Sequence, residues 1–223
     1  MAVYDLEEQE QLDELKTWWK RYGNVVTGLL FAATLGLVVW QGWNWWQRNQ
    51  AAQASVVFGG LQQAAGQGDA KRVRELAGEL IDKYPGTSYA GMGALVSARI
   101  QVDHSDAKNA QAQLAWAAEH AKDAGLRDLA RLRLATVLLD AKSYDEALKQ
   151  LVTEPSAPFA ARFAELRGDI LAAKGKFADA ASAYALALEK VDAVMKKDEV
   201  GAEAHAAYRE VLQSKHDALG ASK

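Results

Sequence analysis

The residue types that most often perform chemistry are sparse in this sequence and lie far apart. There is no cysteine, which excludes disulfides, thiol catalysis and cysteine-ligated zinc. The four histidines, His104, His120, His205 and His216, form no H-E-x-x-H pair of the kind that holds zinc on one helix face. We therefore expect neither a metal site nor a cofactor.

Motifs for nucleotide binding and nucleophilic catalysis are also missing. Gly91-Met92-Gly93 lacks the third glycine of a dinucleotide loop and lies in an alanine-rich stretch. No G-x-S-x-G elbow and no Walker sequence occurs. Most carboxylates lie among Lys and Arg, where they normally form solvated ion pairs. The sequence predicts no enzyme and no small-molecule substrate, so the chemistry that remains is that of a binding surface.

Charge is distributed unevenly along the chain. Residues 1–21 hold six acidic and three basic side chains, whereas residues 47–223 hold 23 of each. A nucleic-acid partner would require a basic surplus in the larger part. We therefore expect no nucleic acid among the partners.

An uncharged run of 26 residues extends from Tyr22 to Gln47, with the sequence YGNVVTGLLFAATLGLVVWQGWNWWQ. Roughly 20 helical residues cross a bilayer, so the run is long enough to span. Amphipathic rings, which favour the headgroup region, lie at both edges: Trp18, Trp19, Tyr22, Trp40, Trp43, Trp45 and Trp46. The run predicts a single transmembrane helix in contact with membrane lipid.

Two other interpretations of this run are less favoured. A buried core helix rarely extends this far without a charge. A cleaved signal peptide could end near Ala52 and Ala54, but its apolar core is normally about 7–15 residues long and its leading segment is basic, whereas this tail is acidic.

The orientation of the helix follows from its basic flanks. Lys16, Lys20 and Arg21 precede it, and only Arg48 lies within the next 20 residues. Basic residues favour the cytoplasmic side, so the N-terminus is expected there and the large domain across the membrane. The expected organisation is a cytoplasmic acidic tail at 1–21, a transmembrane helix at 22–47 and a second domain at 48–223.

Gly28, Ala32 and Gly36 are spaced by four residues and share one face of the predicted membrane helix. Small side chains allow another helix to approach closely. The alternative is that glycine and alanine are simply common in membrane helices. We interpret the stripe as a candidate packing face.

Residues after 50 show apolar spacing of three and four, which predicts an all-α domain. LRLATVLLDAKSYDEALKQL (132–151) and ELRGDILAAKGKFADAASAYALAL (165–188) align at a spacing of 33, with small residues at matching positions. Ala147 and Ala180 would let the two helices of a hairpin touch, while Phe177 and Tyr184 would fill the gap beside them. Ser143 and Glu146 predict a capping box that begins a second helix.

This pattern predicts a degenerate tetratricopeptide-like array of helical hairpins. A final helix at 201–216, after a charged loop at 195–200, is expected to cap its end. First helices of such hairpins line a concave groove, and the candidate groove residues are Leu129, Leu132, Thr136, Leu139, Arg162, Glu165, Asp169 and Ala172. The alternative is that the apolar ones are core and the polar ones inert. Trp116, the only tryptophan outside the anchor, is expected to pack against a neighbouring hairpin.

The whole layout resembles the ancillary SecYEG translocon subunit family, the YfgM-like inner-membrane proteins of Gram-negative bacteria. The resemblance lies in the segment VYDLEEQEQLDELKTWWKRYGN before the membrane helix, in ELRGDILAAKGKFADAASAYALAL and in the ending VLQSKHDALG. The chain departs from the family's usual end, where Gln213-Ser214-Lys215-His216 replaces a more apolar stretch.

The resemblance implies an inner-membrane protein with a periplasmic domain. It implies two partners, the SecYEG translocon and a membrane-anchored periplasmic isomerase chaperone, and a scaffold function that links emerging envelope proteins to periplasmic chaperones. The alternative with the same topology is an envelope structural or assembly scaffold for cell-wall or outer-membrane machinery. The family has no catalytic residues to transfer to this chain.

Overall fold

The computed structural model describes residues 4–196 and 202–220, and within those ranges the regular structure is entirely helical. The chain divides into two compact units, residues 1–49 and residues 50–223, which we describe separately. The elements are α1 (Tyr4–Gly66), α2 (Ala70–Lys83), α3 (Ser88–Asp103), α4 (Ala107–His120), α5 (Ala124–Asp140), α6 (Tyr144–Gln150), the 3-10 helix η1 (Ala157–Phe159), α7 (Ala160–Ala173), α8 (Phe177–Met195) and α9 (Ala202–Gly220).

The first unit contains α1 up to residue 49, including the uncharged run, and the rest of α1 belongs to the second unit. Of the helices that the structure describes, α1 alone is long and apolar enough to cross a membrane, and only 6% of its most apolar window is buried. Phe31, Leu29 and Trp40 are all more than 60% exposed. Such a surface is costly in water but favourable in lipid, which makes α1 the membrane anchor.

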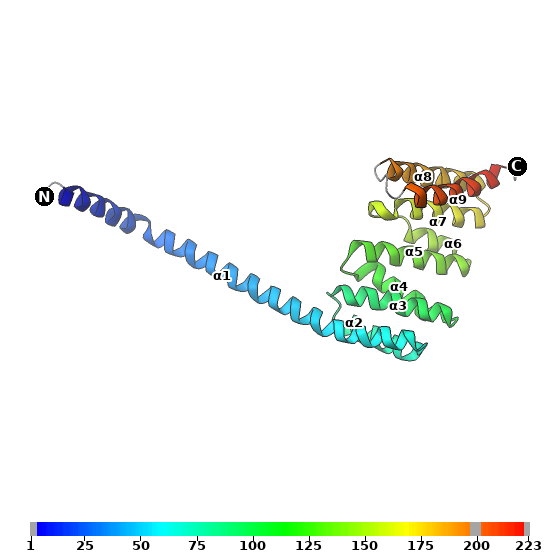
Figure 1. Ribbon diagram of the computed structural model, residues 1–223, viewed down its shortest axis with the longest axis horizontal. Coiled ribbons are helices and arrows are strands. Elements are labelled where there is room, and N and C mark those ends of the chain that lie inside the picture. The colour runs from blue at the N-terminus through cyan, green and yellow to red at the C-terminus, as the bar shows by residue number, and fades with distance from the viewer. Residues whose placement is uncertain (1–3, 197–201, 221–223) are drawn as a thin grey trace. The chain divides into compact units, whose positions relative to one another are not determined.

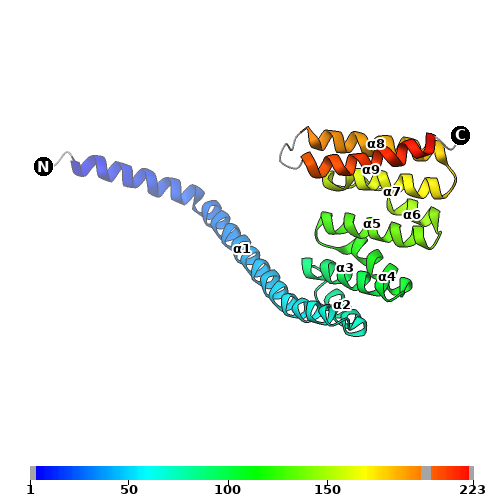
Figure 2. The ribbon, with the colours of Figure 1, turned by 45° about the vertical axis from the view of Figure 1, so that its right-hand side comes forward.

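The second unit contains helices that pack in chain order (Figures 1 and 2). The end of α1 pairs with α2, α3 with α4, α5 with α6 and α7 with α8, while α9 packs on α8. Buried residues fall into four clusters spread along the array, so each hairpin covers the apolar side of the next. This is the predicted all-α tetratricopeptide-like array with a final helix.

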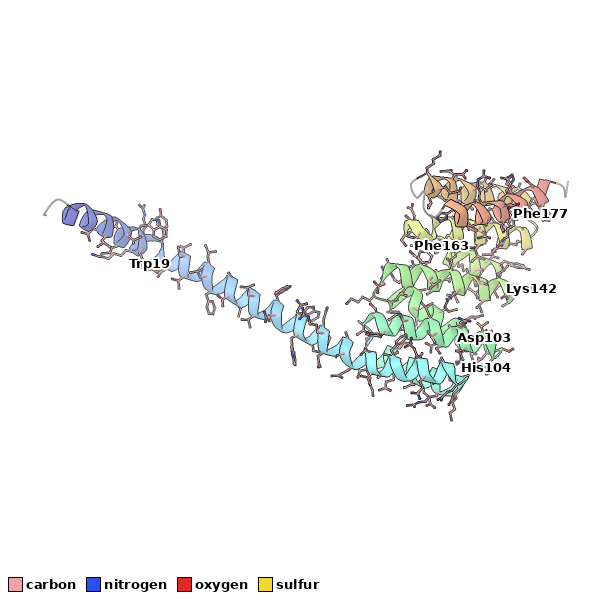
Figure 3. All side chains as sticks on the ribbon, viewed as in Figure 1. Trp19, Asp103, His104, Lys142, Phe163 and Phe177 are labelled. Atoms are coloured by element: carbon pink, nitrogen blue, oxygen red, sulfur yellow. The ribbon has the colours of Figure 1, made fainter. Side chains whose placement is uncertain are left out.

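Four turns with the same geometry join the two helices of each hairpin. Gly68, Ser105, Lys142 and Gly175 all have positive φ, between 58° and 77°. In each turn the next amide donates to the carbonyl five residues earlier, as Lys176 N does to Leu171 O at 2.9 Å. These are Schellman C-caps, and their recurrence shows the four-fold repeat more clearly than the side chains do (Figure 3, Lys142).

Small residues produce the close helix contacts within hairpins. Ala147 and Ala180 are fully buried, and the ring of Tyr184 lies directly against Gly168. Phe177, in contrast, is 49% exposed, so the prediction that it fills the gap was wrong (Figure 3). Phe177 is the first residue of α8, so it lies at the end of the hairpin and not in its interior.

Two local predictions concern helix ends. Ser143 occupies the N-cap position of α6 as the spacing indicated, but its side chain makes no cap hydrogen bond, so the predicted capping box does not form. A charged loop was expected at 195–200. Only residues 195 and 196 of that segment are among the described residues, and the rest of it lies outside them.

The hairpin of α5 and α6 contains a buried carboxylate that was not identified from the sequence. Asp128 in α5 is 3% exposed. Its Oδ2 accepts from the backbone amide of Ser156 at 2.9 Å and from the Ser156 hydroxyl at 2.6 Å, and its Oδ1 accepts from Arg131. Asp128 therefore fixes the segment between the short helix α6 and α7.

Candidate interaction surfaces

The predicted groove residues of α5 divide between core and surface. Leu129, Leu132 and Leu139 are partly buried and pack against core clusters. Thr136 is exposed and donates its hydroxyl to Leu132 O at 3.0 Å. Of the four, Thr136 alone borders a hollow of about 320 Å³ between α3 and α5.

Two arginines at this hollow were not identified from the sequence. Arg133 is half-buried and donates from Nη1 to Leu95 O at 3.4 Å. Burial lowers the pKa of Arg133, and the nearby Arg99 lowers it further. Asp103 and Asp140 border the same hollow, so its net charge is balanced.

Three of the predicted groove residues of α7, Arg162, Glu165 and Asp169, contact α9. Glu165 is 8% exposed, and its carboxylate accepts from Lys215 Nζ at 2.9 Å and from the Tyr208 hydroxyl at 2.7 Å. Lys215 also donates to both oxygens of Asp169, at 2.8 and 2.9 Å. The Tyr184 hydroxyl of α8 donates to Asp169 Oδ1 at 2.7 Å. We call Glu165, Asp169, Tyr184, Tyr208 and Lys215 the α7–α9 polar network.

Arg162 closes one side of this network. Its Nη1 donates to Glu165 Oε2 at 3.3 Å, and its guanidinium carbon lies 4.0 Å from the centre of the Tyr208 ring. Below the network, Leu212 is fully buried with Ala164, Ala187 and Val191. Polar and apolar side-chain contacts together fix α9 on the last hairpin, and Figure 2 shows its ribbon beside those of α7 and α8.

The ionisation states of the network follow from these contacts. Burial alone would raise the pKa of Glu165, but the hydrogen bonds from Lys215 and Tyr208 lower this pKa below its ordinary value of 4.5. Burial alone would lower the pKa of Lys215, but Asp169 and Glu165 raise it above 10.5. Burial and the bond to Glu165 raise the pKa of Tyr208. Glu165 and Lys215 are therefore both charged at neutral pH.

We expect acid to loosen α9. Because the pKa of Glu165 is lower in the folded chain, the carboxylate contributes stability above about pH 4.5 and loses it as the pH falls through the lowered pKa. Thermal unfolding of the full chain in detergent, from about pH 7 to about pH 3, measures this loss. Glu165→Gln should flatten the pH dependence; an unchanged dependence in that variant would contradict the assignment.

Trp116 and His120 lie together on α4, at the contact between neighbouring hairpins. The described residues contain no group of three or more His, Asp or Glu arranged to hold a metal. The His120 ring stacks on Trp116 at 5.6 Å, and Trp116 packs between the first two core clusters. Trp116 therefore packs between neighbouring hairpins, as predicted.

The small-residue stripe of α1 is open. A Cβ atom built on Gly28 or Gly36 would meet nothing within 4 Å, and Ala32 is exposed. The stripe has space for a partner helix, and its use as a packing face stays a prediction.

Comparison with known proteins agrees with this architecture. A family model described as a tetratricopeptide repeat-like domain matches residues 16–221. A protein of Neisseria gonorrhoeae named "Ancillary SecYEG translocon subunit" is 34% identical over 223 residues, covering 98% of this chain and 100% of the relative. Proteins with the same name from Haemophilus influenzae and Escherichia coli are 31% and 29% identical, over 78% and 82% of this chain and 84% and 88% of their own length.

Proposed function

Because the chain belongs to the family of ancillary SecYEG translocon subunits with a tetratricopeptide repeat-like domain, we propose that it is a membrane-anchored protein-interaction scaffold at the Sec translocon. The observation that carries the proposal is the match to the Neisseria gonorrhoeae subunit, which covers 98% of this chain and the whole of the relative. The match includes the membrane anchor as well as the repeats. The mechanism is binding, not turnover.

In this proposal the two units contact different kinds of partner. The exposed apolar surface of α1 supplies lateral contact with other membrane helices, and the stripe of Gly28, Ala32 and Gly36 is its docking face. The repeat domain supplies a surface for a chaperone or an emerging chain, such as a membrane-anchored periplasmic isomerase chaperone.

The proposed location is the inner membrane, with the N-terminus in the cytoplasm and the repeat domain in the periplasm. Lys16, Lys20 and Arg21 before the membrane run support this orientation. The expected boundaries are a cytoplasmic tail at 1–21, a transmembrane segment at 22–47 and a periplasmic domain from 48 to 223.

A matched pair of substitutions tests the docking face. Ala32→Leu places a bulky side chain on the stripe, whereas Ala33→Leu places the same side chain about 100° around the helix. We expect Ala32→Leu to reduce the amount of translocon channel subunit that copurifies from membranes in mild detergent, because close helix approach is blocked. Ala33→Leu should copurify like the native chain.

Two outcomes would contradict the proposal at different levels. Equal effects of Ala32→Leu and Ala33→Leu would remove the stripe as the docking face. Absence of the channel subunit from the native preparation would remove the translocon assignment itself.

A further inference from the structure

Two hollows lie on either side of Lys190 in the last hairpin. The smaller, of about 240 Å³, is bordered by the segment after α6, by α7 and by Leu186 of α8. The larger, of about 530 Å³, is bordered by η1, α7, the end of α8 and α9. Lys190 borders both hollows, and we call the residues that line the two hollows together the Lys190 surface.

The Lys190 surface is apolar between its charges. Val152, Leu186 and Val194 border it and are 73%, 40% and 36% exposed. Phe163 and Val191 form its floor and are buried (Figure 3, Phe163). Apolar side chains exposed around a hollow are typical of binding sites for another protein's side chains.

The charges at its edge are predominantly positive. Arg162, Arg167 and Lys190 border the hollows, and among the described residues that border them Glu154 alone carries a carboxylate. Glu189 lies next to Lys190, with 4.0 Å between ammonium and carboxylate, so this pair is loose.

The arginines keep donors available. Arg162 contacts Glu165 with one nitrogen at 3.3 Å while 58% of its side chain is exposed. Arg167 donates from Nη2 to Leu151 O at 3.1 Å. A guanidinium has five N–H donors, so both groups can donate further hydrogen bonds to a carboxylate.

We propose that the Lys190 surface binds a short acidic amphipathic segment of another protein. Two apolar side chains of that segment occupy the two hollows, and its carboxylates contact Lys190 and Arg162. The proposal rests on the scaffold function in taking another protein as the occupant, and it adds the chemistry of the segment that is recognised. Concave hollows fit inserted side chains, whereas a membrane surface would require apolar side chains that protrude.

A designed peptide tests the proposal on the full chain in nanodiscs of neutral lipid. The probe carries two leucines one helical turn apart, flanked by glutamates, with a fluorophore for anisotropy. A second probe has lysine in place of each glutamate. We expect the acidic probe to bind, the basic probe to bind at least about tenfold more weakly, and Lys190→Glu to weaken the acidic probe by about tenfold.

The matched control is Lys71→Glu, an exposed lysine in the first turn of α2. It makes the same charge change away from the surface and should leave binding within about twofold of the native chain. Leu186→Asp should also weaken the acidic probe, because it places a charge in the smaller hollow. Far-ultraviolet circular dichroism confirms that each variant remains folded.

Three results would overturn the proposal. The first is equal binding of the acidic and basic probes, and the second is an equal effect of Lys190→Glu and Lys71→Glu on binding of the acidic probe. The third is that the full chain binds added anionic vesicles, and that Lys190→Glu abolishes this vesicle binding but leaves binding of the acidic probe unchanged. Copurification of the channel subunit is measured in parallel. Its persistence in Lys190→Glu means that a failure concerns this surface alone, whereas its absence from the native chain concerns the scaffold function.

Discussion

Lys215→Met is expected to destabilise the repeat domain by about 2–4 kcal/mol. The Glu165 and Asp169 side chains are only 11% and 28% exposed, and Lys215 contributes the one ammonium that both carboxylates share. Removing it leaves two like charges close together and partly out of water. Methionine keeps most of the volume, so the loss reports the missing charge rather than a cavity.

Urea unfolding of the full chain in detergent, followed by circular dichroism, measures the effect. The triple variant Lys215→Met, Glu165→Gln, Asp169→Asn should recover most of the lost stability, because neutral amides replace the uncompensated carboxylates. Lys71→Met, on an exposed lysine, should change stability little. A loss in Lys215→Met that the triple variant does not recover would show that charge is not the cause.

Gly168→Ala is expected to cost about 1–3 kcal/mol although alanine is the better helix former. A Cβ atom at Gly168 would lie 2.5 Å from Tyr184 Cε1 and 2.6 Å from its Cδ1. The ring cannot move aside easily, because Tyr184 is 4% exposed and its hydroxyl donates to Asp169. The methyl group would therefore push α7 and α8 apart.

Gly78→Ala is the matched control, and it should change the free energy of unfolding in the opposite direction. Gly78 lies in the interior of α2, and a Cβ atom there would meet nothing within 4 Å. The same substitution should stabilise by about 0.5–1 kcal/mol through helix propensity alone. Stabilisation by both substitutions would contradict the tight contact between Gly168 and Tyr184.

The helical class, the repeats and the anchor could be predicted because they depend on local patterns. Hydrophobic spacing of three and four and an uncharged run with aromatic edges are short-range signals. The left-handed conformation of Ser105 and Lys142 could not be predicted from residue type, because residues other than glycine adopt a positive φ uncommonly.

The candidate site was predicted less completely, because its contacts connect distant parts of the chain. Glu165 and Asp169 were selected as groove residues from their place in the repeat, but their partner Lys215 lies 50 and 46 residues away. The sequence signal was the polar stretch Gln213–His216. Of its members, Lys215 contacts α7, whereas Gln213 and His216 contact Asp217 of α9 itself.

The α7–α9 polar network occupies the predicted groove carboxylates of α7, so partners are expected at other surfaces. With α9 in place, Glu165 is occupied by Lys215 and Tyr208, so a partner is expected at the Lys190 surface of the last hairpin or at exposed positions of α5 such as Thr136. This division assigns the predicted groove carboxylates of α7 to the stability of the array.

Site-specific photocrosslinking in native membranes tests the central claim most directly. A photoreactive residue is placed in turn at Leu29, Leu35 and Val39, all exposed on α1, and adducts are identified by mass spectrometry. A scaffold at the translocon predicts adducts to translocon subunits or to an anchored chaperone. Adducts only to lipid or to the chain itself, with cell-wall or outer-membrane assembly factors on the repeat domain, would contradict it.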